Sequence, residues 1–163
     1  MAIKSELKRR LLWQDQSFLK IWIDPLSYRL LESGKELQNI DETNFINECC
    51  RLGALILLSK IRRRFGARLV FTGVETERLR TLLEIYGKEW KNFKSMLLWT
   101  AIMAALETDN EERQWFCEVI GDAAKTTNLQ AWDEIVAHAS NLFWVGDVLN
   151  KECDNLRPHV YIE

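Results

Sequence analysis

Glycine and proline are scarce in this sequence, which has seven glycines and two prolines among 163 residues. Globular proteins average about 12% for the two together, and turn-rich sandwiches, collagen or long disordered linkers contain more. Seven tryptophans and an apolar content of 47% also exclude a disordered chain. A chain of this length buries roughly two thirds of its unfolded surface, so one domain needs no disulfide or metal to fold.

The sequence also lacks a strong charge of one sign and a long apolar run. It has 22 Lys and Arg against 24 Asp and Glu, a net charge of −2, whereas dedicated nucleic-acid-binding domains are usually basic. The most apolar stretch, Met96 to Leu106, is shorter than the ~20 residues that span a bilayer. No signal peptide is evident, because no apolar run follows a basic N-terminal stretch. We therefore expect an intracellular protein without a membrane segment and without direct DNA binding.

Patterns that would hold a metal or support catalysis are missing as well. The four cysteines, Cys49, Cys50, Cys117 and Cys153, form no CxxC pair, so we interpret them as reduced thiols packed in the interior. No GxSxG, P-loop or GxGxxG motif is present. We expect no metal and no cofactor, and the sequence favours a non-catalytic protein over an enzyme.

His138 is the histidine that invites a catalytic interpretation. It lies one turn after Glu134, which predicts a local hydrogen bond on one helix. Asp147 follows about two and a half turns later, and on a continuous helix that places it on the opposite side. The two residues therefore do not form a dyad, and a boundary histidine with a local partner is the favoured interpretation.

Helical periodicity extends over almost the whole sequence, and we predict an all-α fold. The expected helices cover residues 3–23, 24–34, 41–65, 72–86, 93–106, 109–123 and 130–149. In the last of these the apolar residues, Phe143 included, are expected to point inward. No stretch of alternating polarity is long enough for a strand, so residues 66–72 are expected to form a loop, with a short extended end at 159–162.

Several residues are typical of helix ends. Asp24 before Pro25 predicts a new helix start, and Asp41 predicts another. Glycines favour helix stops, here Gly34 and Gly66. Two capping boxes are expected, Thr72 with Glu75 and Asp109 with Glu112.

Two of the expected helices are apolar around their whole circumference, at Leu52–Ile61 and Phe93–Leu106. A helix of that kind is surrounded by other helices. We therefore predict a single domain, a bundle of about seven helices around two buried central ones. Residues 1–40 would supply N-terminal helices, 41–150 the helical core and 151–163 a C-terminal tail.

Arg62, Arg63 and Arg64 form the densest positive cluster. They suit an anion clamp, because guanidinium groups bind phosphate and carboxylate. They also suit the negative end of a helix dipole. The second interpretation is favoured, because three neighbours on a helix point in three directions.

Four of the seven tryptophans fall in the last three expected helices, namely Trp99, Trp115, Trp132 and Trp144. They could line a pocket for a small hydrophobic metabolite, although plain core packing is the favoured interpretation. The candidate ligand-binding residues are Tyr86, Trp99, Trp115, His138, Trp144 and Asp147.

A succession of short motifs carries a family resemblance. It consists of Cys50–Leu55 (CRLGAL), Ile61–Gly66 (IRRRFG), Leu97–Trp99 (LLW), Glu112–Phe116 (ERQWF), Trp132 and Phe143–Trp144. In this order, over roughly residues 48–147, they resemble the C-terminal part of the fungal-specific transcription factor domain of zinc-cluster regulators. No single motif is decisive; the order of all of them carries the resemblance.

The resemblance implies an α-helical regulatory or interaction module. In this family such a region is thought to act through metabolites, partner proteins or self-association, and a transcription regulator would work in the nucleus. The family's DNA-reading module needs six cysteines around two zinc ions, and nothing of that kind is present here.

Only the second half of the family's regulatory region is matched, so the sequence fits a fragment, a truncated product or a stand-alone protein that reuses the fold. A stand-alone protein could instead bind a small molecule, or act as an unorthodox enzyme of fungal secondary metabolism.

Overall fold

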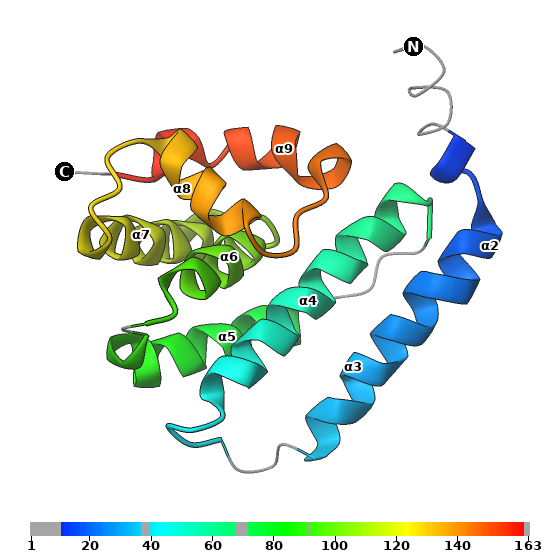
Figure 1. The fold of residues 1–163 in the computed structure, drawn as a ribbon, viewed down its shortest axis with the longest axis horizontal. Helices are drawn as coiled ribbons and strands as arrows, with labels where there is room; N and C mark the ends of the chain where they lie inside the picture. The colour runs from blue at the N-terminus through cyan, green and yellow to red at the C-terminus, as the bar shows by residue number, and fades with distance from the viewer. Residues whose placement is uncertain (1–10, 37–39, 68–71, 91, 162–163) are drawn as a thin grey trace.

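The computed structural model describes residues 11–36, 40–67, 72–90 and 92–161, and this part of the chain is helical without a strand (Figure 1). Within these residues, seven α-helices of nine residues or more pack as one bundle, which confirms the predicted fold class. The elements are α2 (Gln16–Phe18), the π-helix η1 (Leu19–Ile23), α3 (Asp24–Glu36), α4 (Phe45–Arg64), α5 (Gly73–Tyr86), η2 (Gly87–Glu89), α6 (Lys94–Ala105), α7 (Asn110–Thr126), α8 (Trp132–Ser140), α9 (Gly146–Asp154) and η3 (Arg157–His159).

The two helices predicted to be central are α4 and α6. Every residue from Leu97 to Ala105 in α6 is buried, and α6 packs on α4, α7 and α8. The helices α4 and α6 approach closely at Gly53, because a Cβ there would lie 2.8 Å from Cζ3 of Trp99. At such a distance any added side chain would push the two central helices apart.

The N-terminal helices differ from the prediction, and the expected residues 3–10 lie outside the described part. Residues 16–36 form one continuous helical segment, and the break expected at Asp24–Pro25 falls instead at residues 13–15. There Asp15 Oδ1 accepts a hydrogen bond from the Ser17 N–H at 2.9 Å. The Asp24 N–H donates to the Leu19 carbonyl five residues back, and this wider turn accommodates Pro25, which has no N–H to donate.

Glycine has two different roles at the ends of α3 and α4. Gly66 ends α4 as predicted, with φ +72° and its N–H donating to the Arg63 carbonyl at 3.0 Å. Gly34 does not end α3, which continues to Glu36. Instead the missing side chain makes room for Arg51, whose Cζ lies 2.6 Å from the place where a Cβ would stand.

A buried ion cluster ties α3, α4 and α5 together. The Glu48 carboxylate is fully buried and pairs with the guanidinium groups of Arg51 (2.6 Å) and Arg78 (2.8 Å). Arg51 also donates to the Leu30 carbonyl of α3 at 3.0 Å. The charge of Glu48 is therefore compensated inside the bundle.

The predicted start of α4 and the two predicted capping boxes are wrong. Asp41 forms a turn, accepting from the Thr43 N–H at 2.8 Å, and α4 begins at Phe45. The Thr72 hydroxyl donates to Glu107 Oε1 at 2.7 Å instead of capping α5. No side chain caps α7 at Asp109 either. For Asp41 the local turn binds the side chain, and for Thr72 a carboxylate from a distant part of the sequence does so.

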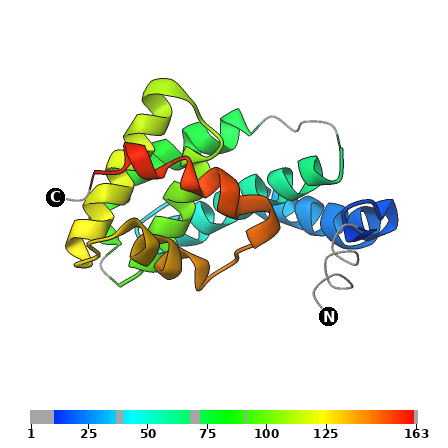
Figure 2. The same ribbon diagram turned by 90° about the horizontal axis from the view of Figure 1, so that it is seen from above.

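The expected helix at 130–149 is two helices, α8 and α9, joined by residues 141–145. Two tryptophans hold the connecting loop: Trp99 Nε1 donates to the Phe143 carbonyl at 2.7 Å, and Trp144 Nε1 donates to Asn150 Oδ1 at 2.8 Å. Phe143 is 73% exposed, so its predicted inward orientation is wrong. The N-terminal segment α2–α3 lies at one edge of the molecule in both views (Figures 1 and 2).

Candidate functional site

An apolar depression lies between α3, α4 and the loop at 141–145, and we call it the apolar groove. It has a volume of about 590 Å³. One wall is the face of η1 and α3 that carries Ile23, Leu26 and Leu30, and the floor includes Leu57 and Ile61 of α4. The spacing of three and four residues puts each set on one helix face.

The opposite wall of the groove is the loop that the two tryptophan hydrogen bonds hold in place. Phe143 and Trp144 lie on this wall, and the Trp99 hydrogen bond to the Phe143 carbonyl fixes its backbone. The indole N–H of Trp144 is already bonded to Asn150. The groove therefore offers apolar surface and few free polar groups, which suits a ligand with a hydrocarbon body.

A second depression lies where the end of α4 meets α9, and we call it the cationic depression. It has a volume of about 290 Å³. Four cationic side chains line it, together with two carboxylates and Val148: the cations are Lys60, Arg63, Arg64 and Lys151, and the carboxylates are Asp147 and Glu152. The excess of cations favours an anionic group in this place.

Lys60 is buried at the inner end of the cationic depression. Its Nζ donates to the Leu106 carbonyl at 3.1 Å and pairs with Glu152 (2.6 Å) and Glu107 (3.3 Å). Burial raises the pKa of Glu107, but hydrogen bonds from Arg63 and Thr72 and the charge of Lys60 outweigh it and hold that pKa below its ordinary value. Glu107 is therefore ionised, and the cluster fastens α4 to the turn after α6 and to α9.

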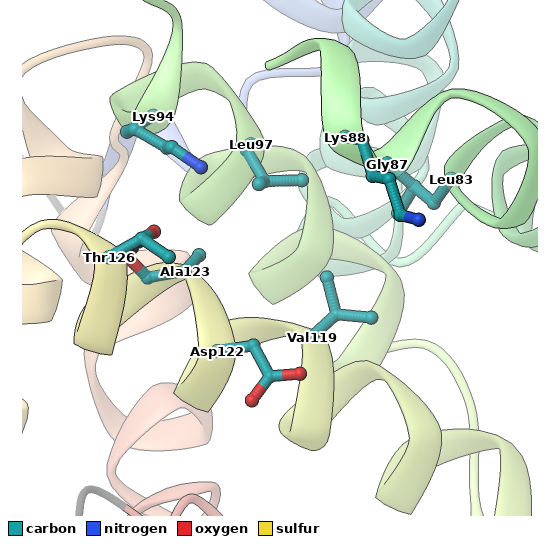
Figure 3. Close-up of a pocket in the computed structure, with 9 residues that line it drawn as sticks. All are labelled: Leu83, Gly87, Lys88, Lys94, Leu97, Val119, Asp122, Ala123 and Thr126. Carbon is teal, nitrogen blue, oxygen red and sulfur yellow. Dashed lines mark hydrogen bonds between the residues drawn. The ribbon is translucent and has the colours of Figure 1, made fainter. Parts of the chain in front are cut away.

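A third cavity, of about 420 Å³, lies between α5, α6 and α7 (Figure 3). Lys88 and Lys94 approach it from one side, and Asp122 approaches from α7 on the other. Leu97 and Val119 supply apolar surface between these charges. None of the candidate ligand-binding or anion-binding residues named from the sequence lines this cavity.

The six candidate ligand-binding residues lie in different places. Trp144 lines the apolar groove and Asp147 lines the cationic depression. Trp115 lies in an open depression on α7, with the Arg80 guanidinium 5.0 Å from its ring centroid. Trp99 is buried in the core, where it supports the groove through its hydrogen bond to the Phe143 carbonyl and through a ring contact with Phe143, the ring centroids being 6.4 Å apart.

Tyr86 and His138 have local structural partners. Tyr86 stacks on Phe45 with ring centroids 4.9 Å apart and donates to the Ile40 carbonyl. His138 Nδ1 lies 3.3 Å from the Ser95 hydroxyl, so its partner is on α6 and not Glu134. Glu134 instead accepts from backbone N–H groups at the start of α8. His138 and Asp147 lie on different helices, α8 and α9.

The arginine run points in three directions, as its helical spacing indicates. Arg62 pairs with Asp24 of α3, and Arg63 pairs with Glu107. The Arg64 guanidinium lies 5.9 Å from the ring centroid of Trp13. The three guanidinium groups therefore do not form a common clamp, and Arg64 is the most exposed of them.

The four cysteines are free thiols, and burial raises the pKa of each. The pKa rises to about 11 for Cys50 and Cys117 and to about 12 for Cys153. A thiol with so high a pKa is protonated near neutral pH and is a poor nucleophile. The packing interpretation of the cysteines fits these positions.

The buried thiols make folding stability fall in alkaline solution. The unfolded chain ionises its thiols above about pH 8.5, whereas the folded chain keeps them protonated. The contribution of these thiols to the free energy of unfolding is therefore fully present below that pH and is lost as the pH rises toward 11–12. Each buried thiol contributes about 1 kcal/mol of loss per pH unit in this window. Urea unfolding at pH 7.5, 8.5 and 9.5 should show a shallower decline for Cys153→Ala. An identical slope in both proteins would contradict this assignment.

The described residues contain no group of three His, Cys, Asp or Glu side chains placed to hold a metal ion. Within the same ranges, no helix has the length and apolar character needed to cross a bilayer. No protein-family model matches the chain, and no curated protein or solved structure is significantly similar to it. The resemblance to the fungal regulatory domain therefore stays a prediction.

Sequence reasoning missed the apolar groove as a site, although it named one of its lining residues, Trp144, as a candidate ligand-binding residue. Nothing in the sequence indicated the break between α8 and α9, and the loop at 141–145 formed by that break is the wall of the groove opposite α3.

Proposed function

We propose that this chain is a helical binding module of regulatory type that takes a small hydrophobic ligand in the apolar groove. The observation that carries this proposal is the groove itself: about 590 Å³ lined by apolar side chains of η1, α3, α4 and the loop at 141–145. Small-molecule sites in proteins are commonly concave, mostly apolar and of this size.

The resemblance of residues 48–147 to the regulatory domain of fungal zinc-cluster regulators supports a regulatory role. A ligand-controlled module of that kind would act in the nucleus, through a partner protein or a second copy, without reading DNA itself. A stand-alone binding protein or an unorthodox enzyme of secondary metabolism would use the same groove in the cytoplasm. Ligand binding in the groove is common to both proposals, so it is the property to test first.

The outer face of η1 and α3 supports a second candidate function, which is binding of a protein. Ile21 and Tyr28, seven residues apart along this segment, are each more than 60% exposed on one edge of the molecule. Large apolar side chains grouped on an exposed helix are typical of protein interfaces. A partner or second copy bound to this face would cover the outer side of α3 and leave the side that lines the groove uncovered.

The groove can be tested by filling it. Ala54 lines the floor and is half-buried, so Ala54→Trp should block ligand without introducing a charge. We expect the fluorescence enhancement of the neutral apolar probe N-phenyl-1-naphthylamine to saturate with the unmodified protein. The affinity should fall by about tenfold or more in Ala54→Trp, a loss of about 1.4 kcal/mol.

Ala137→Trp, at an exposed position of α8, adds the same indole away from the groove and serves as the control. Leu26→Glu, on the partly exposed rim, is a second test that leaves the core unchanged. The variants Ala137→Trp and Leu26→Glu should both fold, with a far-UV circular dichroism spectrum like that of the unmodified protein. Equal probe binding by all four proteins would overturn the proposed function.

A further inference from the structure

We propose that the apolar groove and the cationic depression form one site for an amphipathic anion, namely an acyl chain that carries a carboxylate. The chain would lie in the groove and its carboxylate at Arg64 and Lys151. This inference rests on the proposed function, because it names the chemical class of the ligand that the groove would take.

The two depressions adjoin along α4 and the start of α9. Leu57, Ile61 and Arg64 follow one another at four and three residues along α4, so they lie on one face. The first two line the groove and Arg64 lines the cationic depression. On the other side Val145 lines the groove and Asp147 the cationic depression, two positions further along the chain. Figure 1 shows the start of α9 near the C-terminal end of α4.

The charges of the depression favour an anion at its outer rim. Lys60 and Arg63 are committed to Glu107 and Glu152 by the ion pairs described above. The remaining cations are Arg64 and Lys151, and both are exposed, against the single carboxylate of Asp147. Positive charge therefore exceeds negative charge at the place where the groove ends.

The geometry of Arg64 and the dipole of α9 add to this charge. The guanidinium of Arg64 lies over the ring face of Trp13, a contact that leaves its N–H groups available for a carboxylate. The N-cap residue of α9 is Val145, which makes no side-chain cap hydrogen bond. Asp147 of the first turn lines the cationic depression, so the positive end of the α9 dipole lies at this rim. A neutral hydrocarbon would use none of these groups.

The experiment compares dodecanoate with dodecan-1-ol, which has the same chain without the charge, as competitors of N-phenyl-1-naphthylamine at low salt. We expect dodecanoate to bind about tenfold more tightly than the alcohol, because each of two exposed charge pairs contributes about threefold. The double variant Arg64→Glu, Lys151→Glu should lose the preference while its affinity for the alcohol stays the same. The control Lys125→Glu, Arg157→Glu makes the same change of net charge at exposed positions elsewhere and should keep the preference.

Each of the following outcomes overturns the inference, and all but the last leave the proposed function standing. Equal affinity for the acid and the alcohol, or an equal loss of preference in both double variants, shows that the rim does not select an anion. Displacement by neither compound, with the probe still bound, excludes an acyl chain but leaves the groove as a binding site. Failure of the probe itself to bind removes the proposed function.

Discussion

Leu98→Asp is expected to abolish folding. Leu98 is fully buried in α6, the helix that packs on α4, α7 and α8. An unpaired carboxylate in such a place costs several kcal/mol even when it takes up a proton, and a domain of this size has only about 5–15 kcal/mol in total. The purified variant should lack a cooperative thermal transition by circular dichroism. Leu55→Asp on α4, also buried, should behave similarly.

Ile85→Asp is the matched control for Leu98→Asp, because Ile85 is a large apolar residue of α5 that is mostly exposed. It should change the stability by no more than about 0.5 kcal/mol, the usual range for surface substitutions. A cooperative transition in Leu98→Asp close to that of Ile85→Asp would mean that α6 is not the centre of the bundle.

Glu48→Ala is expected to lower the free energy of unfolding by about 3–5 kcal/mol. The Glu48 carboxylate is fully buried and compensates Arg51, whose side chain is 11% exposed, while Arg78 reaches solvent more easily. Removal of the carboxylate leaves the Arg51 charge without its partner, and that uncompensated charge dominates the loss. Urea unfolding monitored by tryptophan fluorescence gives the value directly.

Two further variants decide whether the loss arises from the unpaired charge. Glu84→Ala removes an exposed carboxylate that pairs with Arg80 one turn away on α5, and it should cost no more than about 1 kcal/mol. Glu48→Met combined with Arg51→Met removes both charges and should be more stable than Glu48→Ala alone. If the double variant were the less stable one, the packing of the side chains, and not the charge, would explain the loss.

The sequence predicted the parts of the fold that depend on local periodicity. Apolar residues around the whole helix circumference correctly predicted α4 and α6 as the central helices, at Leu52–Ile61 and Phe93–Leu106. Gly66 was recognised because a left-handed residue at a helix end is a local requirement. These features need no knowledge of which helix packs on which.

Two of the helix ends that were predicted wrongly depend on distant partners. Thr72 has a good capping pattern with Glu75, but in the fold its hydroxyl finds the Glu107 carboxylate. Gly34 is typical of a helix stop, but in the fold its lack of a side chain makes room for the guanidinium of Arg51 from the next helix. Sequence patterns alone do not reveal which of two available partners a polar or small residue will meet.

The candidate site was only partly predictable for the same reason. A continuous helix at 130–149 would have pointed Phe143 inward, whereas the hydrogen bond from Trp99 holds its backbone in a loop. That loop forms a wall of the apolar groove and opens the cationic depression at Asp147. Neither depression exists without a break that a side chain from α6 stabilises.

The position of α3 has a consequence for the dynamics of the molecule. It packs mainly on α4, at the edge of the bundle, while α6 and its neighbours form the interior (Figure 2). Such a peripheral helix can open as a unit at less cost than global unfolding, and its amide protons then exchange with solvent first. Because α3 is also one wall of the groove, a ligand bound there would stabilise α3 against this local opening. Binding of the ligand would therefore make the edge of the protein more ordered.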